Sequence, residues 1–273
     1  MSVETNIDLK KQSPKEQSLT VKDLDLWFYI PVAVALVLLV WLYMPIFHQW
    51  YGEWMKEESQ YGHAPLVPII SLGLIWLRKK ELSEVPIRPT GVGYILLVPL
   101  LLGVVAVLLA GSRVAGGLAF PLIVASMVLI LLGWRMLRAT WVETAYLYFM
   151  CVLPGFILTK LTFKVQLLSA VNAGHLLELI GLDVNRTGAL ISLPNSTVLV
   201  GAPCSGFQLL ISLFAFTVLF AYLREGPAWG KVAMVVLMIP ISLLVNSFRI
   251  FTIALVGEFM GSEAMHTYHN PSW

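Results

Sequence analysis

The sequence predicts an all-α polytopic membrane protein with about seven transmembrane helices. Its mean hydropathy is +0.80 and only 12% of its 273 residues are charged, whereas about 25% of the residues of a soluble globular protein are charged. Several apolar runs are also long enough to cross a bilayer, which takes about 20 helical residues. A surface with so little charge suits lipid, and the net charge of +2 gives no indication of a nucleic-acid partner.

Seven segments are candidate spans, and a polar N-terminal tail at 1–26 precedes the single transmembrane domain predicted for 27–273. The run 165–182 is apolar as well, but it contains Asn172, His175 and Glu178. We therefore expect 165–182 to form an interfacial or re-entrant amphipathic helix rather than a span. The candidate spans are 27–47, 64–77, 92–110, 114–133, 142–159, 206–223 and 232–256.

The distribution of lysine and arginine predicts a cytoplasmic N-terminus, because short cytoplasmic loops carry an excess of these residues. In this orientation twelve of them lie in cytoplasmic segments, five lie in outer segments, and Arg249 lies within a span. The twelve are Lys10, Lys11, Lys15, Lys22, Arg78, Lys79, Lys80, Arg88, Arg135, Arg138, Arg224 and Lys231. The five are Lys56, Arg113, Lys160, Lys164 and Arg186.

The segment 184–203 differs from the apolar runs around it. It combines β-branched residues with turn formers such as Asn185, Gly188 and Pro194. This composition predicts a short extracytoplasmic β-hairpin or ordered loop that leads into Cys204.

Cys204 lies in the stretch Ala-Pro-Cys-Ser-Gly, at the predicted outer start of the sixth span. Pro203 suits a position at or before a first helical turn, so Cys204 is expected at a helix N-terminus. Unpaired amide groups and the helix dipole favour a negative charge there, which lowers the pKa of a thiol. Cys204 is therefore a candidate nucleophile, although a small side chain buried in a turn fits the same pattern.

Arg249 lies inside the seventh predicted span, where an arginine costs about 2.5–3.5 kcal/mol or more to insert. Such residues usually face a protein interior or a wet cavity, and snorkelling to the outer interface is the alternative. Arg249 follows Lys231 by 18 residues, which is about 27 Å of helix and places it near the outer end. Asn246 shares its helical face and could orient Arg249 or satisfy a neighbouring helix.

Three histidines are expected on the same outer face. His63 opens the second span, and His266 and His269 follow the seventh. Each alone is as consistent with a solvated or interfacial side chain as with a functional one. As a set, cysteine, arginine and histidine can supply a nucleophile, an electrostatic stabiliser and a base. An arginine within about 4–6 Å would bring the pKa of a thiol below its ordinary value of about 8.5.

The sequence indicates no metal site and no cofactor. Its histidines and cysteines lack ligand spacings such as C-x-x-C or H-E-x-x-H, and no glycine-rich phosphate loop or dinucleotide fingerprint occurs. Cys151, among apolar residues in the middle of a predicted span, is expected to be a packing residue.

Four stretches, in order along the chain, resemble motifs of the exosortase/archaeosortase family from about Trp54 to the C-terminus. Residues 61–68 (Tyr-Gly-His-Ala-Pro-Leu-Val-Pro) are similar to its Y-S-H-G-x-L-V-P motif and precede a basic cluster. Residues 181–194 are similar to its G-I-x-V-x-R-x-G-x-x-I-x-L-P stretch. Cys204-Ser205-Gly206 resembles the nucleophile motif, and residues 246–250 (Asn-Ser-Phe-Arg-Ile) resemble N-x-x-R-I.

The resemblance implies a membrane cysteine transpeptidase or protease of a bacterial or archaeal cytoplasmic membrane, with its active site on the extracytoplasmic face. Its partners would be exported proteins whose C-terminal sorting signal, such as PEP-CTERM, consists of a short motif, a transmembrane helix and a basic tail. Membrane lipid would be its other partner, because it would surround the enzyme. Cys204 would form the acyl-enzyme, Arg249 would stabilise the oxyanion or thiolate, and His269, with His266 as the alternate, would be the acid/base. His63, Ser205, Gly206 and Asn246 would line the site.

The sequence departs from the family pattern at its C-terminus. The family histidine is usually followed by H-x-x-x-G and an eighth span, whereas here the sequence reads His269-Asn270-Pro271-Ser272-Trp273 and stops. The eighth span is therefore either missing or truncated, and the choice between His266 and His269 stays open.

Two functions of other classes compete with this interpretation. A transporter with Arg249 in its substrate pathway predicts paired half-helices and polar residues at the membrane midplane. A lipid or glycan transferase, involved in exopolysaccharide or surface assembly, could use the same outer face but has no clear need for Cys204. The polar residues gather at one predicted face, which favours the peptidase.

Overall fold

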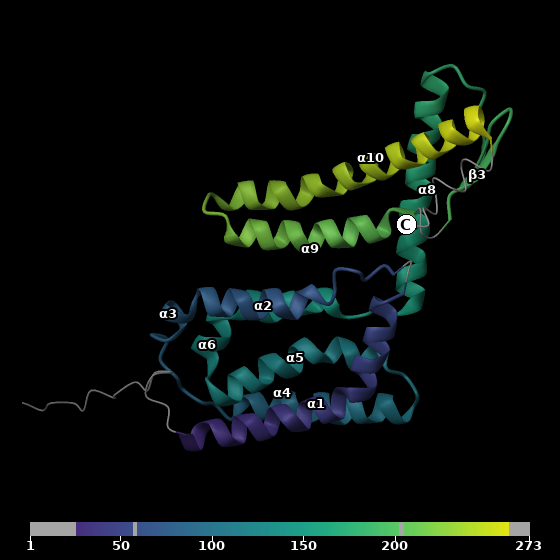
Figure 1. The fold of residues 1–273 in the computed structure, drawn as a ribbon. Helices are drawn as coiled ribbons and strands as arrows, with labels where there is room; N and C mark the ends of the chain where they lie inside the picture. The colour runs from purple at the N-terminus through teal and green to yellow at the C-terminus, as the bar shows by residue number, and fades with distance from the viewer. Residues whose placement is uncertain (1–25, 57–58, 202–204, 262–273) are drawn as a thin grey trace, which may run out of the picture.

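The computed structural model describes residues 26–56, 59–201 and 205–261 of the chain, and the described part is mostly helical (Figure 1). In Figure 1, α9 and α10 lie alongside each other, and α8 runs across them at one end of the pair. The helices are α1 (Leu26–Trp54), α2 (Leu66–Leu77), α3 (Lys79–Leu82), α4 (Val92–Leu109), α5 (Val114–Leu131), α6 (Trp134–Ala139), α7 (Trp141–Tyr146), the 3-10 helix η2 (Leu147–Met150), α8 (Gly155–Leu179), α9 (Phe207–Leu223) and α10 (Ala228–Met260).

Four of the described helices, α1, α4, α5 and α10, are long and apolar enough to cross a membrane, and the number rises to five if a bent pair counts as one span. The prediction of about seven spans counted two shorter helices. α2 has 12 residues, or about 18 Å at 1.5 Å per residue, and α9 has 17 residues, or about 26 Å. Both fall short of the roughly 30 Å of hydrocarbon that a straight span crosses.

The bent pair consists of residues 141–150, which form α7 and η2, and of α8, and it lies where the sequence predicted the span 142–159. Its first part ends at Met150, and α8 leaves at 83° to it. Pro154 causes the break, because its extended backbone (ψ 133°) and its restriction of Leu153 both oppose a continuous helix. The freed amide of Leu153 donates instead to the Tyr61 hydroxyl at 2.9 Å. The predicted amphipathic segment 165–182 is thus mostly the second half of α8.

Residues 184–203, expected to form a hairpin or ordered loop, contain three short antiparallel strands. They are β1 (Asn185–Thr187), β2 (Leu190–Ser192) and β3 (Thr197–Leu199), in the order β1-β2-β3. Ile191 pairs with both Arg186 and Val198, and its own side chain is fully buried. This small sheet packs on α8 and α10 through Ile191, Val198 and Val200.

Aromatic residues of α1 form the centre of the core between α1 and α5. Tyr43 and Trp50 are 0% and 1% exposed, and both make edge-on contacts with Phe120 of α5. Gly117 lets Trp50 approach α5, because a Cβ there would lie 2.9 Å from the indole ring. Cys151 is buried in the same core, as expected of a packing residue.

A buried ion pair joins α2, α7 and α9. Arg78 Nη1 donates to Glu143 Oε1 at 2.9 Å, and the Tyr222 hydroxyl donates to the same oxygen at 2.9 Å. Glu143 is only 1% exposed, so its charge depends on these partners. The other side of the Arg78 guanidinium binds the exposed Glu81.

Candidate active site

A pocket of about 360 Å³ lies between the start of α9 and the middle of α10. It contains Asn246 and Arg249, which are two of the four polar side chains predicted for the site within the described residues, together with the predicted Gly206. Both helices contribute side chains spaced by three or four residues, because such residues share one helical face. Its lining consists of Gly206, Gln208, Leu209, Ser212, Val245, Asn246 and Arg249.

Gly206 brings the first turn of α9 against α10. It precedes the helix with a φ of +78°, and a Cβ at this position would lie 2.5 Å from the Asn246 side chain. Asn246 is 2% exposed and is therefore held in place by its surroundings. Ser205 is buried beside it, and its hydroxyl oxygen accepts a hydrogen bond from the Phe207 amide at 3.2 Å. The glycine of the Cys-Ser-Gly stretch thus fixes where α9 begins relative to α10.

We expect Gly206→Ala to destabilise the protein by more than the roughly 1–2 kcal/mol that left-handed backbone alone costs an alanine. The added methyl group also overlaps the buried Asn246 side chain. The measurement is the thermal unfolding midpoint in detergent. Gly188→Ala is the matched control, since Gly188 has a φ of +65° but nothing within 4 Å of an added Cβ. Equal losses in the two variants would contradict the close contact between α9 and α10.

Arg249 projects from α10 into this pocket, one turn beyond Asn246. Its side chain is exposed, and within the part of the chain that the structure describes its guanidinium makes no ion pair. α10 continues for eleven residues beyond Arg249, to Met260, so the arginine lies well inside the helix. Immediately after it, Ile250, Ile253 and Ala254 pack in the same core as Ala170 and Ala173 of α8. Arg249 therefore lies on a segment of α10 that α8 holds in place.

His63 reaches the pocket through one hydrogen bond. It lies in the turn before α2, and its Nδ1 is 3.0 Å from the hydroxyl of Ser212, which lines the pocket. The neighbouring Gly62 lies against Gln208, another lining residue. Burial lowers the pKa of His63 below its ordinary value of 6.5, with the Phe149 carbonyl acting in the opposite direction. His63 is therefore a neutral imidazole at physiological pH.

The lowered pKa of His63 predicts that the folded protein loses stability in acid. Between the lowered pKa and 6.5 the unfolded chain binds a proton that the folded chain does not. Stability is therefore full above about pH 6.5 and falls as the pH decreases. We expect the unfolding midpoint to drop between pH 7.5 and pH 5, and His63→Gln to reduce this drop. His48→Gln, at an exposed histidine of α1, is the control and should leave the drop unchanged. A drop of the same size in His63→Gln would contradict the buried neutral imidazole.

Two anchors hold the chain on the N-terminal side of the Cys-Ser-Gly stretch. The carboxylate of Glu258, near the end of α10, accepts hydrogen bonds from the amide and the side chain of Asn195 at 3.0 and 2.8 Å. Gln166 of α8 donates to the carbonyl of Val200. Together with the contact between Gly206 and Asn246, these anchors fix the backbone at Asn195, Val200 and Gly206.

The structure brings Arg249, Asn246 and Gly206 together and links His63 to them through Ser212. Cys204, His266 and His269, the predicted nucleophile and the two predicted acid/base residues, lie outside the described residues. Among the residues that are described, no group of three or more histidine, cysteine, aspartate or glutamate side chains is arranged to hold a metal ion.

Sequence reasoning missed Gln208 and Ser212. Both are polar residues on the apolar helix α9, four positions apart and therefore on one face. Gln208 is also four positions after Cys204. That spacing within α9 was the available signal.

The residues of this pocket all lie within the region of the chain that matches a known protein family. A family model described as transmembrane exosortase matches residues 54–272, which is most of the chain. The chain belongs to the transmembrane exosortase family. Membership places it among membrane transpeptidases and proteases, and the apolar helices agree with a protein that crosses the membrane. No curated protein and no solved structure matches the chain.

Proposed function

We propose that this exosortase-family protein is a membrane cysteine transpeptidase or protease that cleaves C-terminal sorting signals of exported proteins. The observation that carries the proposal is the pocket at the start of α9, where Arg249, Asn246 and Gly206 meet. Cys204 stands two residues before Gly206 in the sequence, so only a short stretch of chain separates it from a residue that lines the pocket.

The electrostatics of this pocket favour a thiolate. The guanidinium of Arg249 has no carboxylate partner among the described residues, so its positive charge is free to act on a nearby anion. The N-terminus of α9 adds the positive end of the helix dipole. Both effects lower the pKa of a thiol at Cys204. The neutral His63 adds no competing charge.

The reaction follows from these groups. The Cys204 thiolate attacks the scissile carbonyl carbon, and the negative charge that forms on the carbonyl oxygen is stabilised by Arg249 and by amide groups at the start of α9. The peptide C–N bond then breaks, and the leaving amine takes a proton from His269, or from His266 as the alternate. The thioester that remains is attacked by water or by an acceptor amine, which restores the thiol.

The location of the site is part of the proposal. The excess of lysine and arginine on the α3 side and in the N-terminal tail assigns those segments to the cytoplasm. α9 and α10 then carry the Arg249 pocket toward the extracytoplasmic face, where a transmembrane helix and a basic tail of the substrate would follow the cleaved motif.

Co-expression with a protein that carries a candidate sorting signal tests this function. We expect the substrate to lose its transmembrane helix and basic tail, and the mass of its new C-terminus separates hydrolysis from transfer to an amine. The matched control is co-expression with a Cys204→Ala variant present in the membrane in equal amount. A substrate that keeps its full mass beside the intact enzyme, for every family-type signal tested, would contradict the proposal.

A further inference from the structure

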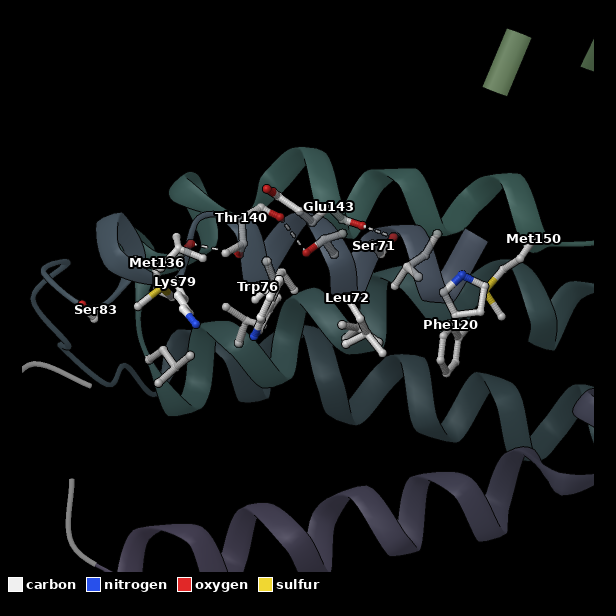
Figure 2. A pocket seen from close by; sticks show the side chains of 18 of the residues that line it. Ser71, Leu72, Trp76, Lys79, Ser83, Phe120, Met136, Thr140, Glu143 and Met150 are labelled. Carbon is white, nitrogen blue, oxygen red and sulfur yellow. Dashed lines mark hydrogen bonds between the residues drawn. The ribbon is translucent and has the colours of Figure 1, made fainter. Parts of the chain in front are cut away.

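A second cavity, of about 860 Å³, lies between α2, α5 and α7 and shares no lining residue with the Arg249 pocket. Figure 2 shows Lys79 and Ser83 at one end of this cavity and Phe120 and Met150 at the other. The α2 part of its lining runs from Pro68 to Trp76, which is about 12 Å of helix, and Lys79 follows at the start of α3. One leaflet of a bilayer contributes about half of the roughly 30 Å hydrocarbon core. The cavity is therefore about as long as the acyl region of one leaflet.

The walls of this cavity consist mostly of apolar side chains. Its four buried or half-buried hydroxyl groups turn back to the backbone: Ser71 donates to the Glu143 carbonyl, Thr140 to the Met136 carbonyl, Thr144 to the Thr140 carbonyl and Ser83 to the Lys80 carbonyl. Glu143 Oε1 is bound by Arg78 and Tyr222, whereas Glu143 Oε2 is buried and has no hydrogen-bond partner among the described residues. The remaining lining consists mostly of aliphatic and aromatic side chains. The part of a ligand that lies along the length of this cavity therefore has to be mostly apolar.

The cavity is open on the α2 side. Leu72 and Trp76 line it, and each is 66% exposed. A fully apolar opening of this kind on a membrane-spanning protein faces lipid, which supplies apolar chains at high local concentration.

One end of the cavity carries positive charge. Lys79 lies over the Trp76 ring at 4.5 Å, and among the described residues its ammonium makes no ion pair. Arg78 and Lys80 adjoin it in sequence, and Ser83 lies nearby. Basic pockets between membrane helices are typical sites for anionic lipid headgroups.

We propose that the cavity between α2, α5 and α7 is a binding site for an anionic phospholipid. Its acyl chains lie along Leu72, Phe120 and Met150, and its phosphate pairs with Lys79. The cationic end and the apolar length fit an amphiphile with one negative head and long chains, whereas the head of a zwitterionic lipid would bring a second positive charge beside Lys79. The site involves neither Cys204 nor Arg249, so it is independent of the peptidase proposal.

Lipid titration by native mass spectrometry tests the site on the full-length protein in detergent, with dioleoylphosphatidylglycerol and dioleoylphosphatidylcholine as probes. We expect the wild type to retain phosphatidylglycerol more tightly than phosphatidylcholine. Lys79→Gln should weaken phosphatidylglycerol binding about fivefold, as expected for one lysine near a lipid phosphate. Lys80→Gln is the matched control, because Lys80 is exposed but does not line the cavity.

A cavity-filling variant tests the apolar part separately. Leu72→Trp adds volume at an exposed position, so folding is preserved, and we expect it to reduce retention of both lipids. Inorganic phosphate should not compete, because the acyl chains supply most of the affinity. Equal effects of Lys79→Gln and Lys80→Gln, or equal affinity for the two lipids, would overturn the proposal. A wild-type dimer that Leu72→Trp converts to a monomer would overturn it as well, since a second copy would then be the occupant.

Discussion

Cys204→Ala should leave a sorting-signal substrate uncleaved, with processing below about one thousandth of the wild-type rate. Alanine removes the sulfur that forms the thioester, and none of the remaining groups at the pocket can form that bond. The measurement is the fraction of substrate of reduced mass after co-expression, normalised to the amount of enzyme in the membrane.

Cys151 provides the matched control for this prediction. It is the other cysteine of the chain, is only 2% exposed, and donates weakly to the Gly117 carbonyl in the core. Cys151→Ala should process the substrate at a near wild-type rate. Normal processing by Cys204→Ala would remove the nucleophile assignment, whichever way the Cys151 control behaves.

Arg249→Ala should lower the rate of processing by about 10²–10³-fold, which is the usual effect of removing one donor to a developing oxyanion. Arg249→Lys should remain well below the wild type, because a lysine supplies a point charge instead of the planar fork of donors. The measurement is the rate of substrate cleavage in membranes that contain equal amounts of each variant.

Arg224→Ala is the control for Arg249. Arg224 is an exposed arginine that follows α9 at its other end, so it shares the helical hairpin but not the pocket. We expect its rate to be near that of the wild type. If Arg249→Ala and Arg224→Ala were equally active, the cation at the pocket would have no role in the reaction.

The parts of the fold that the sequence predicted well depend on local composition. The apolar runs that became α1, α4, α5 and α10 are long and carry few charges, so their helical structure follows from residue type. The short strands in 184–203 follow from β-branched residues next to turn formers. The predicted span 142–159 is not one continuous helix, because Pro154 breaks it into two parts that meet at 83°.

The parts of the site that could not be predicted depend on contacts between distant residues. The Asn246 and Gly206 motifs were recognised separately, but only the structure shows that a Cβ at Gly206 would meet the Asn246 side chain. His63 and Ser212 are 149 residues apart, and no periodicity in the sequence links them. Glu258 and Asn195, which anchor the strands to α10, are likewise joined only by the fold.

The central claim is that the cation of Arg249 keeps Cys204 in the thiolate form. The most direct test is the rate of Cys204 alkylation by iodoacetamide as a function of pH, in a Cys151→Ala background. We expect a thiol pKa well below the ordinary value of about 8.5, and an increase of about one unit or more in Arg249→Gln. A pKa near 8.5 that is the same with and without Arg249 would contradict the claim.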